Sequence, residues 1–162
     1  MLIKSTLTQK DFINVNFILL YSKTAVKIFT AIIIVFFIVS AVTVAFIPKV
    51  NFSQLIVPVL MLLLFPVLIY FAAKRSYAAN KRISETIEYQ FAKDHLIMTG
   101  ESFHSQLTWD KVYKVTETKN WILIWQNRQI ANAIPKRDVW DGQIEDLKKI
   151  LTAHKIKNNL PA

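Results

Sequence analysis

The sequence predicts an α+β membrane protein with a transmembrane helical hairpin, a small antiparallel sheet or barrel after it, and a helix near the C-terminal end. Three observations lead to this prediction. Two long apolar runs without a charged residue lie in the first half of the 162-residue chain. From residue 84 the apolar residues recur at every second position, which is the period of a β-strand. After residue 140 they return to the spacing of an amphipathic helix.

The apolar runs cover residues 28–47 and 55–73, and the linker between them is short. A bilayer core is about 30 Å thick and a helix rises about 1.5 Å per residue, so each run is long enough to cross once. Two buried helices of a soluble protein are an alternative, but such helices are rarely apolar over so long a run. A cleaved signal peptide would begin earlier in the chain. We therefore expect residues 28–73 to form a transmembrane hairpin.

Basic residues flank this hairpin at both ends. They are Lys4, Lys10, Lys23, Lys27, Lys74, Arg75, Lys81 and Arg82. The linker of residues 48–54 carries only Lys49, and residues 74–83 form a basic connector. Because lysine and arginine are retained on the cytoplasmic side, we expect a multi-pass protein of the cell inner (cytoplasmic) membrane with both termini in the cytoplasm.

The net charge of +9 belongs mainly to the membrane half of the chain. Residues 1–83 hold nine basic residues and one acid, whereas residues 84–162 hold eleven basic residues and ten acids. The second half therefore lacks the one-sided positive charge of a nucleic-acid-binding domain, and we expect no nucleic acid among the partners. The chain has no cysteine, which excludes disulfides, thiolate nucleophiles and cysteine-based zinc sites.

Residues 1–27 are expected to be a juxtamembrane segment. Thr8 and Asp11 have the spacing of a helix-starting capping pair, and apolar residues crowd the stretch after them. Two interpretations remain open for this stretch. It forms either an amphipathic helix that lies in the headgroup region or a plain extension of the first membrane helix. Neither apolar run contains an ionisable group, which disfavours a channel or transporter.

Short alternating segments separated by turn residues predict six strands after the connector. We expect them at residues 87–91, 96–99, 103–107, 113–118, 121–126 and 129–134. Residues 121–125 are apolar on both faces, so both faces must be covered. One face is expected to line the core, and the last helix is expected to cover the other. That helix should begin near Asp141, which can cap it.

Two apolar helices followed by a short strand-rich domain and one helix resemble the bacterial YcxB-like family. The residues that carry the resemblance are Thr6, Leu7, Thr8, Asp11, Trp109, Val112, Val115, Trp121 to Trp125 and Ile134 to Arg137. The resemblance implies that residues 84–156 form a domain similar to the pleckstrin-homology (PH) fold, a bent barrel closed by a C-terminal helix, with a polar tail at 157–162. That fold has seven strands, and we expect the seventh between Ser102 and Thr118.

No pattern of catalytic or metal-binding residues stands out. His95, His104 and His154 have no partner at metal-ligand spacing, and with only two glycines the chain has no phosphate-binding glycine loop. The acids near the last helix start are the kind that complement a helix dipole. The family resemblance implies no established activity. We therefore expect no enzyme activity, no cofactor and no metal.

The function we expect is that of a non-enzymatic membrane-anchored module, whose domain binds a protein or a lipid at the cytoplasmic face. Its partners would be the bilayer and either anionic headgroups or a membrane protein. The candidate contact residues are the basic clusters Lys111 with Lys114 and Lys136 with Arg137, together with Lys74, Arg75, Lys81 and Arg82. The alternative is an immunity-type protein that protects the membrane against a secreted peptide toxin. The oligomeric state is unknown.

Overall fold

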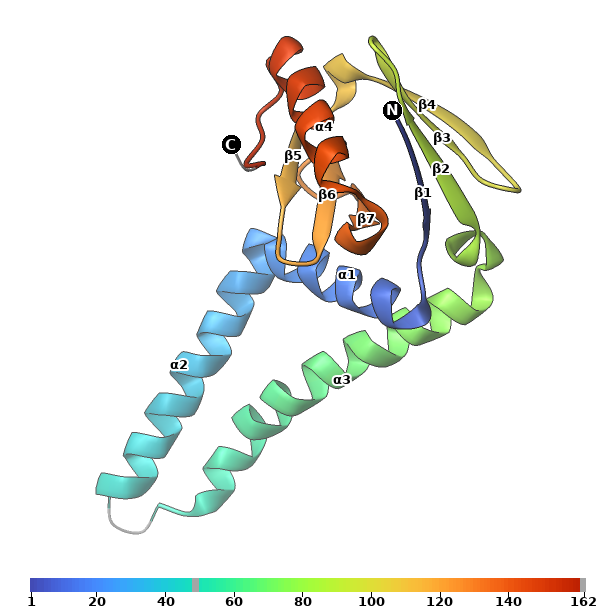
Figure 1. Cartoon of the computed structure of the whole chain (residues 1–162). Helices are drawn as coiled ribbons and strands as arrows, with labels where there is room; N and C mark the ends of the chain where they lie inside the picture. Colours follow the sequence, from blue (N-terminus) through green and yellow to red (C-terminus); the bar gives the residue numbers. More distant parts are fainter. Residues whose placement is uncertain (48–49, 161–162) are drawn as a thin grey trace.

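The computed structural model describes residues 1–47 and 50–160 (Figure 1). Lys49 of the expected linker, the last two residues of the expected tail and the side chain of Asp141 lie outside the described residues. The helices are α1 (Gln9–Ser22), α2 (Thr24–Phe46), α3 (Ile56–Ala79) and α4 (Asp141–Ala153). The strands are β1 (Leu2–Thr6), β2 (Thr86–Phe91), β3 (His95–Thr99), β4 (His104–Thr108), β5 (Lys114–Glu117), β6 (Trp121–Trp125) and β7 (Ala131–Pro135). Short 3₁₀ turns are η1 (Phe52–Leu55), η2 (Lys81–Ser84), η3 (Trp109–Lys111) and η4 (Lys136–Asp138).

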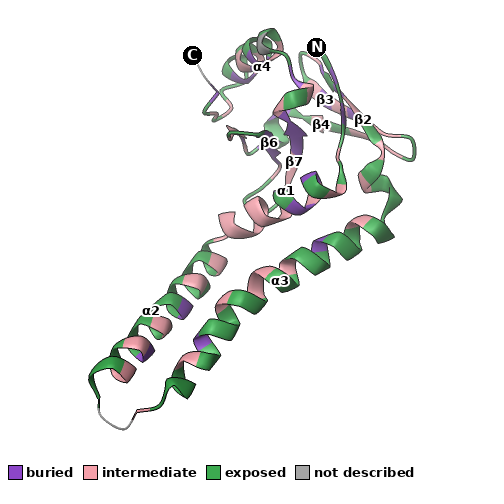
Figure 2. Cartoon of the chain, turned by 60° about the horizontal axis from the view of Figure 1, so that its bottom comes forward, coloured by how far each residue is buried: buried purple, intermediate pink, exposed green. Residues whose placement is uncertain are grey.

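The two apolar runs form α2 and α3, and α3 continues through Pro66 without interruption. Both helices are long and apolar enough to cross a membrane. In the most apolar 18-residue stretch of each, only 11% of the residues are buried in α2 and 6% in the segment that contains α3. Figure 2 shows that most of the hairpin is exposed. A core helix of a soluble protein would instead hide its apolar side chains inside the fold. The hairpin expected from the sequence is thus present as two long apolar helices.

Helix α1 is a separate element, so the plain-extension interpretation was wrong. The chain leaves helical geometry at Lys23, where φ is −72° and ψ is 129°. The N-terminus of α1 carries the expected capping box, in which the Thr8 hydroxyl accepts from the Asp11 N–H and the Asp11 carboxylate accepts from the Thr8 N–H. Figure 1 shows α1 lying between the sheets and the hairpin. Rings also join α1 to α3, because Phe12 contacts Tyr77 and Tyr21 contacts Phe65.

The strands form two antiparallel sheets rather than a closed barrel, which corrects the expected barrel. One sheet has the order β1-β2-β3-β4 and the other β5-β6-β7. The turn η3 leads the chain from the first sheet into the second, and no ladder joins the sheets among the described strands. The six predicted strands are present, with ends shifted by one or two residues. The seventh strand is not between Ser102 and Thr118, because it is β1, which pairs with β2.

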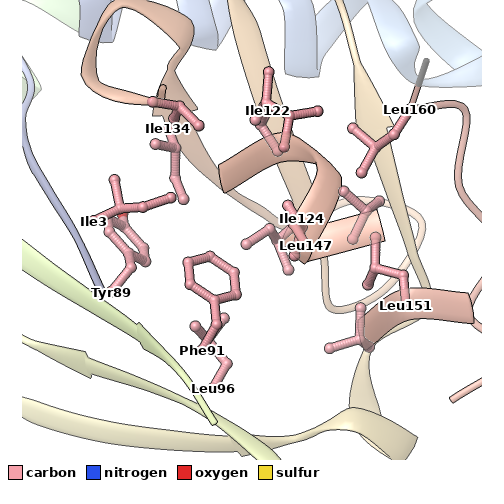
Figure 3. Packing of buried hydrophobic residues seen from close by; sticks show 14 of the residues in the cluster. Ile3, Tyr89, Phe91, Leu96, Ile122, Ile124, Ile134, Leu147, Leu151 and Leu160 are labelled. Atoms are coloured by element: carbon pink, nitrogen blue, oxygen red, sulfur yellow. The ribbon is translucent and has the colours of Figure 1, made fainter. Parts of the chain in front are cut away.

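The main hydrophobic core lies between the two sheets and under α4. Tyr89, Phe91 and Leu96 come from the first sheet, while Ile122 and Ile124 project from β6 to meet them (Figure 3). Leu147 and Leu151 of α4 complete this cluster, and both are fully buried. The alternation predicted for β6 therefore holds, since its even-numbered apolar residues face the core.

The opposite face of β6 is covered by α1 rather than by α4, which corrects the sequence-based expectation. Trp121, Leu123 and Trp125 form a second cluster with Val15 of α1. Partly buried neighbours of this cluster are Leu7, Ile18, Leu19 and Ala131. The prediction that both faces of β6 would be buried was correct, because a strand that is apolar on both faces must be packed against another element on each side. The second cover comes from the other end of the chain.

A fragment that begins after the hairpin should therefore fold poorly. Residues 84–160 without β1 and α1 leave the Trp121–Leu123–Trp125 face in water, and such an apolar patch promotes aggregation. We expect the fragment to bind an apolar fluorescent dye strongly, and a peptide of residues 1–22 added in trans to reduce that binding. The same peptide with Val15→Asp is the control and should have little effect. A monomeric fragment with a dispersed NMR spectrum and no dye binding would contradict the two-cover arrangement.

Candidate functional site: a basic pocket beside the helix junction

A pocket of about 450 Å³ lies where α1 passes into α2 and meets the edge of the β5-β6-β7 sheet. We call it the junction pocket. Its lining consists of Ser22, Lys23, Thr24, Ala25, Tyr113, Lys114, Trp125, Arg128 and Gln129. The pocket thus combines residues around the start of α2 with the start of β5, the end of β6 and the β6–β7 turn.

Local structure explains how each cation reaches the pocket. Lys23 occupies the extended residue between α1 and α2. Lys114 opens β5, and its Nζ lies 5.1 Å from the centre of the Trp125 ring, which is a cation–π distance. Arg128 belongs to the β6–β7 turn, which Asn127 fixes by accepting hydrogen bonds from two backbone N–H groups of that turn.

The Trp125 ring forms a rigid wall of the pocket. It is buried, and its Nε1 donates a hydrogen bond of 2.8 Å to the Thr116 hydroxyl. Tyr113 is about half exposed at 48% and adds a second ring to the lining. Of the two rings only Tyr113 presents a wet edge, and such a ring is typical of membrane interfaces and of ligand pockets.

The charge of the pocket is one-sided. Among the described residues that line it, none is acidic, and Lys23, Lys114 and Arg128 make no ion pair within the described part of the chain. The Thr24 hydroxyl and the Gln129 amide supply further hydrogen-bonding atoms, whereas the Ser22 hydroxyl already donates to the Leu19 carbonyl at 2.7 Å. Three cations with nearby hydroxyl groups form an environment that suits a phosphate or another polyoxygen anion.

Of the eight basic residues predicted as contacts, only Lys114 lies in this pocket. Lys111 is exposed and pairs with its neighbour Asp110 at 3.6 Å. Lys74 and Arg75 lie exposed in the last turns of α3. Lys81 and Arg82 follow in η2 and line a separate polar groove that also contains Glu85 and Glu101. The predicted clusters are thus distributed over different faces.

Lys136 and Arg137 were also predicted as contacts, but each forms an ion pair within the domain. Lys136 forms an ion pair with Glu117 of β5. Arg137 forms a bidentate pair with Asp11 of α1, with Nη1 at 2.9 Å from Oδ1 and Nη2 at 2.6 Å from Oδ2. Both residues belong to η4, so each fixes the turn before α4 to another part of the domain.

The Asp11–Arg137 pair joins α1 to the turn before α4 through a largely buried carboxylate. The Asp11 residue is only 7% exposed, and its carboxylate also accepts a hydrogen bond from the Thr8 hydroxyl. Hydrogen bonds from Arg137 hold the pKa of Asp11 far below its usual range, although burial acts in the opposite direction. Nearby, the buried Ser5 of β1 donates to Asp138 at 2.7 Å, so the network joins β1, α1 and η4.

Sequence reasoning missed Lys23 and Arg128 as site residues. Lys23 served only as evidence of topology, and Arg128 was assigned only to a turn. Nothing in their local sequence places them beside Lys114, because the pocket depends on how α1 packs on β6. No group of three or more His, Asp or Glu side chains that could hold a metal ion occurs among the described residues.

Comparison with known proteins identifies one family. A family model described as YcxB-like protein matches residues 91–151, which extend from the end of β2 into α4. This match confirms the resemblance inferred from the sequence over that segment. No curated protein and no solved structure matches the chain.

Removal of the Asp11 charge should destabilise the fold. Hydrogen bonds to charged groups contribute about 1.5–3 kcal/mol, so Asp11→Asn should lower the free energy of unfolding by about that amount. The exposed pair of Asp110 and Lys111 provides the control, because Asp110→Asn should change it by less than about 0.5 kcal/mol. Denaturant unfolding of the detergent-solubilised chain, followed by tryptophan fluorescence, measures both values.

The same pair gives a pH dependence with a defined sign. The pKa of Asp11 is lower in the folded state than in the unfolded state, so its contribution is complete above the unfolded pKa of about 3.9 and is lost as the pH falls below that value. The difference in stability between the parent chain and Asp11→Asn should therefore shrink as the pH is lowered through 4. A difference that stays constant down to pH 2 would contradict this assignment.

Proposed function

We propose that this chain, with its YcxB-like domain, is a non-enzymatic membrane-anchored module that binds the phosphate headgroup of an anionic phospholipid at the cytoplasmic face. The observation that carries the proposal is the junction pocket, where Lys23, Lys114 and Arg128 gather without an acidic partner in the described lining. Cations, hydroxyl groups and aromatic rings line the pocket. Its described lining contains no carboxylate or histidine that could act as a general acid or base.

The position of the pocket along the chain supports a lipid as the ligand. Lys23 and Thr24 lie about one helical turn before the apolar run that begins at residue 28, so their side chains would lie at the level of the headgroups if α2 crosses the bilayer. The half-exposed Tyr113 adds an aromatic residue of the kind that is enriched at that level. Each basic residue near an anionic leaflet contributes about 1 kcal/mol to attraction.

A PH-like architecture is part of the proposal. It is supported by the strand count, since four strands in one sheet and three in the other precede the C-terminal helix α4. The basic flanks of the hairpin support an orientation with both termini in the cytoplasm of a cell whose inner membrane holds α2 and α3. In this orientation the pocket and the two sheets face the cytoplasmic leaflet.

Neutralising the pocket should weaken binding of anionic lipid. We expect the triple variant Lys23→Gln, Lys114→Gln, Arg128→Gln to lose up to about 3 kcal/mol, or roughly 100-fold, in its preference for phosphatidylglycerol over phosphatidylcholine. Native mass spectrometry of the full chain, released from nanodiscs that contain both lipids, counts the retained molecules of each. If the attraction to anionic lipid were purely non-specific, removal of any three positive charges of the protein would weaken it to the same extent.

A matched control removes the same charge elsewhere. Lys93, Lys119 and Lys157 are exposed and lie outside the pocket lining, so their triple substitution by Gln should leave the lipid preference nearly unchanged. If both triple variants lose the preference to the same extent, or if neither does, the pocket is not a headgroup site.

The orientation can be tested with single cysteines because the chain has none of its own. Ser53→Cys, in the hairpin loop, should react with a membrane-impermeant maleimide on intact cells. Ser102→Cys, in the turn before β4, should react only after the cells are opened. Labelling of Ser102→Cys in intact cells would reverse the orientation and place the pocket outside.

A further inference from the structure

A second cavity of about 430 Å³ lies on another side of the β-domain and differs in character from the junction pocket. It is bounded by the two sheets, by α1 and by the connection from α3 to β2, and we call it the inter-sheet cleft. We propose that the inter-sheet cleft binds a long-chain fatty acid. The ligand and the lining residues differ from those of the headgroup pocket, so the two proposals stand or fall separately.

The lining of the cleft is mostly apolar. Phe12, Val15 and Leu19 of α1 form one wall, and Met98 of β3 with Phe103 of the β3–β4 turn forms another. A volume of roughly 300–1,000 Å³ is typical of sites that enclose a small ligand. The cleft exists because the two sheets do not close into a barrel, which leaves apolar side chains on both sides of a gap. Apolar surfaces of this kind favour an alkyl chain over water.

One buried polar atom in this apolar lining lacks a hydrogen-bond partner within the described structure, and a tyrosine hydroxyl adds a second donor to the lining. The Asn132 Nδ2 is buried and makes no hydrogen bond. The Tyr89 residue, which also lines the cleft, is only 3% exposed. Burial raises the pKa of Tyr89 to about 12, so the hydroxyl keeps its proton and remains a donor.

An unsatisfied donor inside an apolar cavity, here Asn132 Nδ2, points to a ligand that brings an acceptor. Leaving such a group without a partner is costly, and a ligand oxygen removes that cost. A carboxyl group carries two oxygens and accepts from both an amide N–H and a phenol. A simple hydrocarbon or a sterol ring system would fill the volume but would leave Asn132 Nδ2 unpaired.

Arg82 makes the cleft favour an anionic ligand. Its guanidinium lies 3.9 Å from the centre of the Phe103 ring, at the side where η2 borders the cleft. Among the described lining residues none is acidic. Glu85, whose charge acts on Arg82, instead accepts a hydrogen bond from the Ser102 N–H and lies outside the lining. An ionised carboxylate is therefore favoured over a fatty alcohol or an ester.

The end of α3 provides a route by which a ligand passes from the bilayer to the cleft. Asn80, Arg82 and Ile83 border the cleft and come directly after the second apolar helix, so the cleft lies close to the end of a candidate membrane span. A single-chain amphiphile that partitions into the bilayer is therefore supplied beside it. A fatty acid fits this supply and the charge of Arg82, whereas a two-chain phospholipid would leave one chain outside the cleft.

Photolabelling of the full chain in phosphatidylcholine nanodiscs tests the proposal. The probe is a palmitic acid analogue with a diazirine on its alkyl chain, and the labelled peptides are mapped by mass spectrometry. We expect labels on the α1 segment that contains Val15 and on the β3 segment that contains Met98, and competition by excess palmitic acid. Labels confined to α2 and α3, or labels that palmitic acid does not displace, would overturn the proposal.

Substitutions that block the cleft test whether the labelled fatty acid is bound inside it. Ala131→Trp places an indole in the lining and should reduce cleft labelling at least tenfold, while Ala153→Trp at the exposed end of α4 should leave it unchanged. If Ala131→Trp unfolds, as judged by circular dichroism, Asn132→Leu removes a donor with little change in size and should reduce labelling several-fold. Undiminished labelling in a folded Ala131→Trp or in Asn132→Leu would exclude the cleft as the site.

Two further comparisons, one with an alcohol probe and one with a phospholipid probe, define the chemical class of the ligand. Arg82→Gln should lower labelling by the acid to the level given by the corresponding diazirine alcohol. Stronger cleft labelling by a diazirine phosphatidylcholine than by the acid would overturn the assignment to a free fatty acid. The triple substitution of the junction pocket should leave fatty-acid labelling intact, so that failure of the headgroup proposal is distinguishable from failure of this one.

Discussion

The need to cover both faces of β6 determines how the rest of the protein is arranged. Ile122 and Ile124 enter the core beneath α4, while Trp121, Leu123 and Trp125 need a separate apolar partner. That partner is α1, which precedes the hairpin in the chain. The β-domain is therefore discontinuous in sequence. It contains residues from both sides of the hairpin, and the two long apolar helices are an insertion between its first helix and its second strand.

This arrangement joins the β-domain to the hairpin through α1. One side of α1 packs on β6, and its aromatic residues Phe12 and Tyr21 contact α3. The Tyr77 hydroxyl of α3 adds a hydrogen bond to the Leu7 carbonyl. The Asp11–Arg137 pair then fixes the start of α1 to the turn before α4. Both cavities form along α1 because it is the layer that meets the sheets, the first apolar helix and the second.

Elements that depend on local composition were readable from the sequence. The apolar runs became α2 and α3, and the alternation after Glu85 became β2 to β7. Strand β1 was missed because it is short and only Ile3 and Ser5 are buried in it, which gives too little alternation to identify a strand. The capping pair at Thr8 was recognised, but the partner of Asp11 is 126 residues away. Side chains that meet only through tertiary packing, such as Lys23, Lys114 and Arg128, have no local signal.

The discontinuity of the β-domain imposes an order on biosynthesis. Strand β1 and helix α1 leave the ribosome before the hairpin, and their partners β2, β6 and η4 follow it. Membrane insertion of α2 and α3 therefore comes before completion of the four-stranded sheet. Until then α1 has no strand to cover and its apolar side is available to the bilayer surface. Once inserted, the hairpin holds the two halves of the domain within reach of each other, which raises their effective concentration as a short linker does.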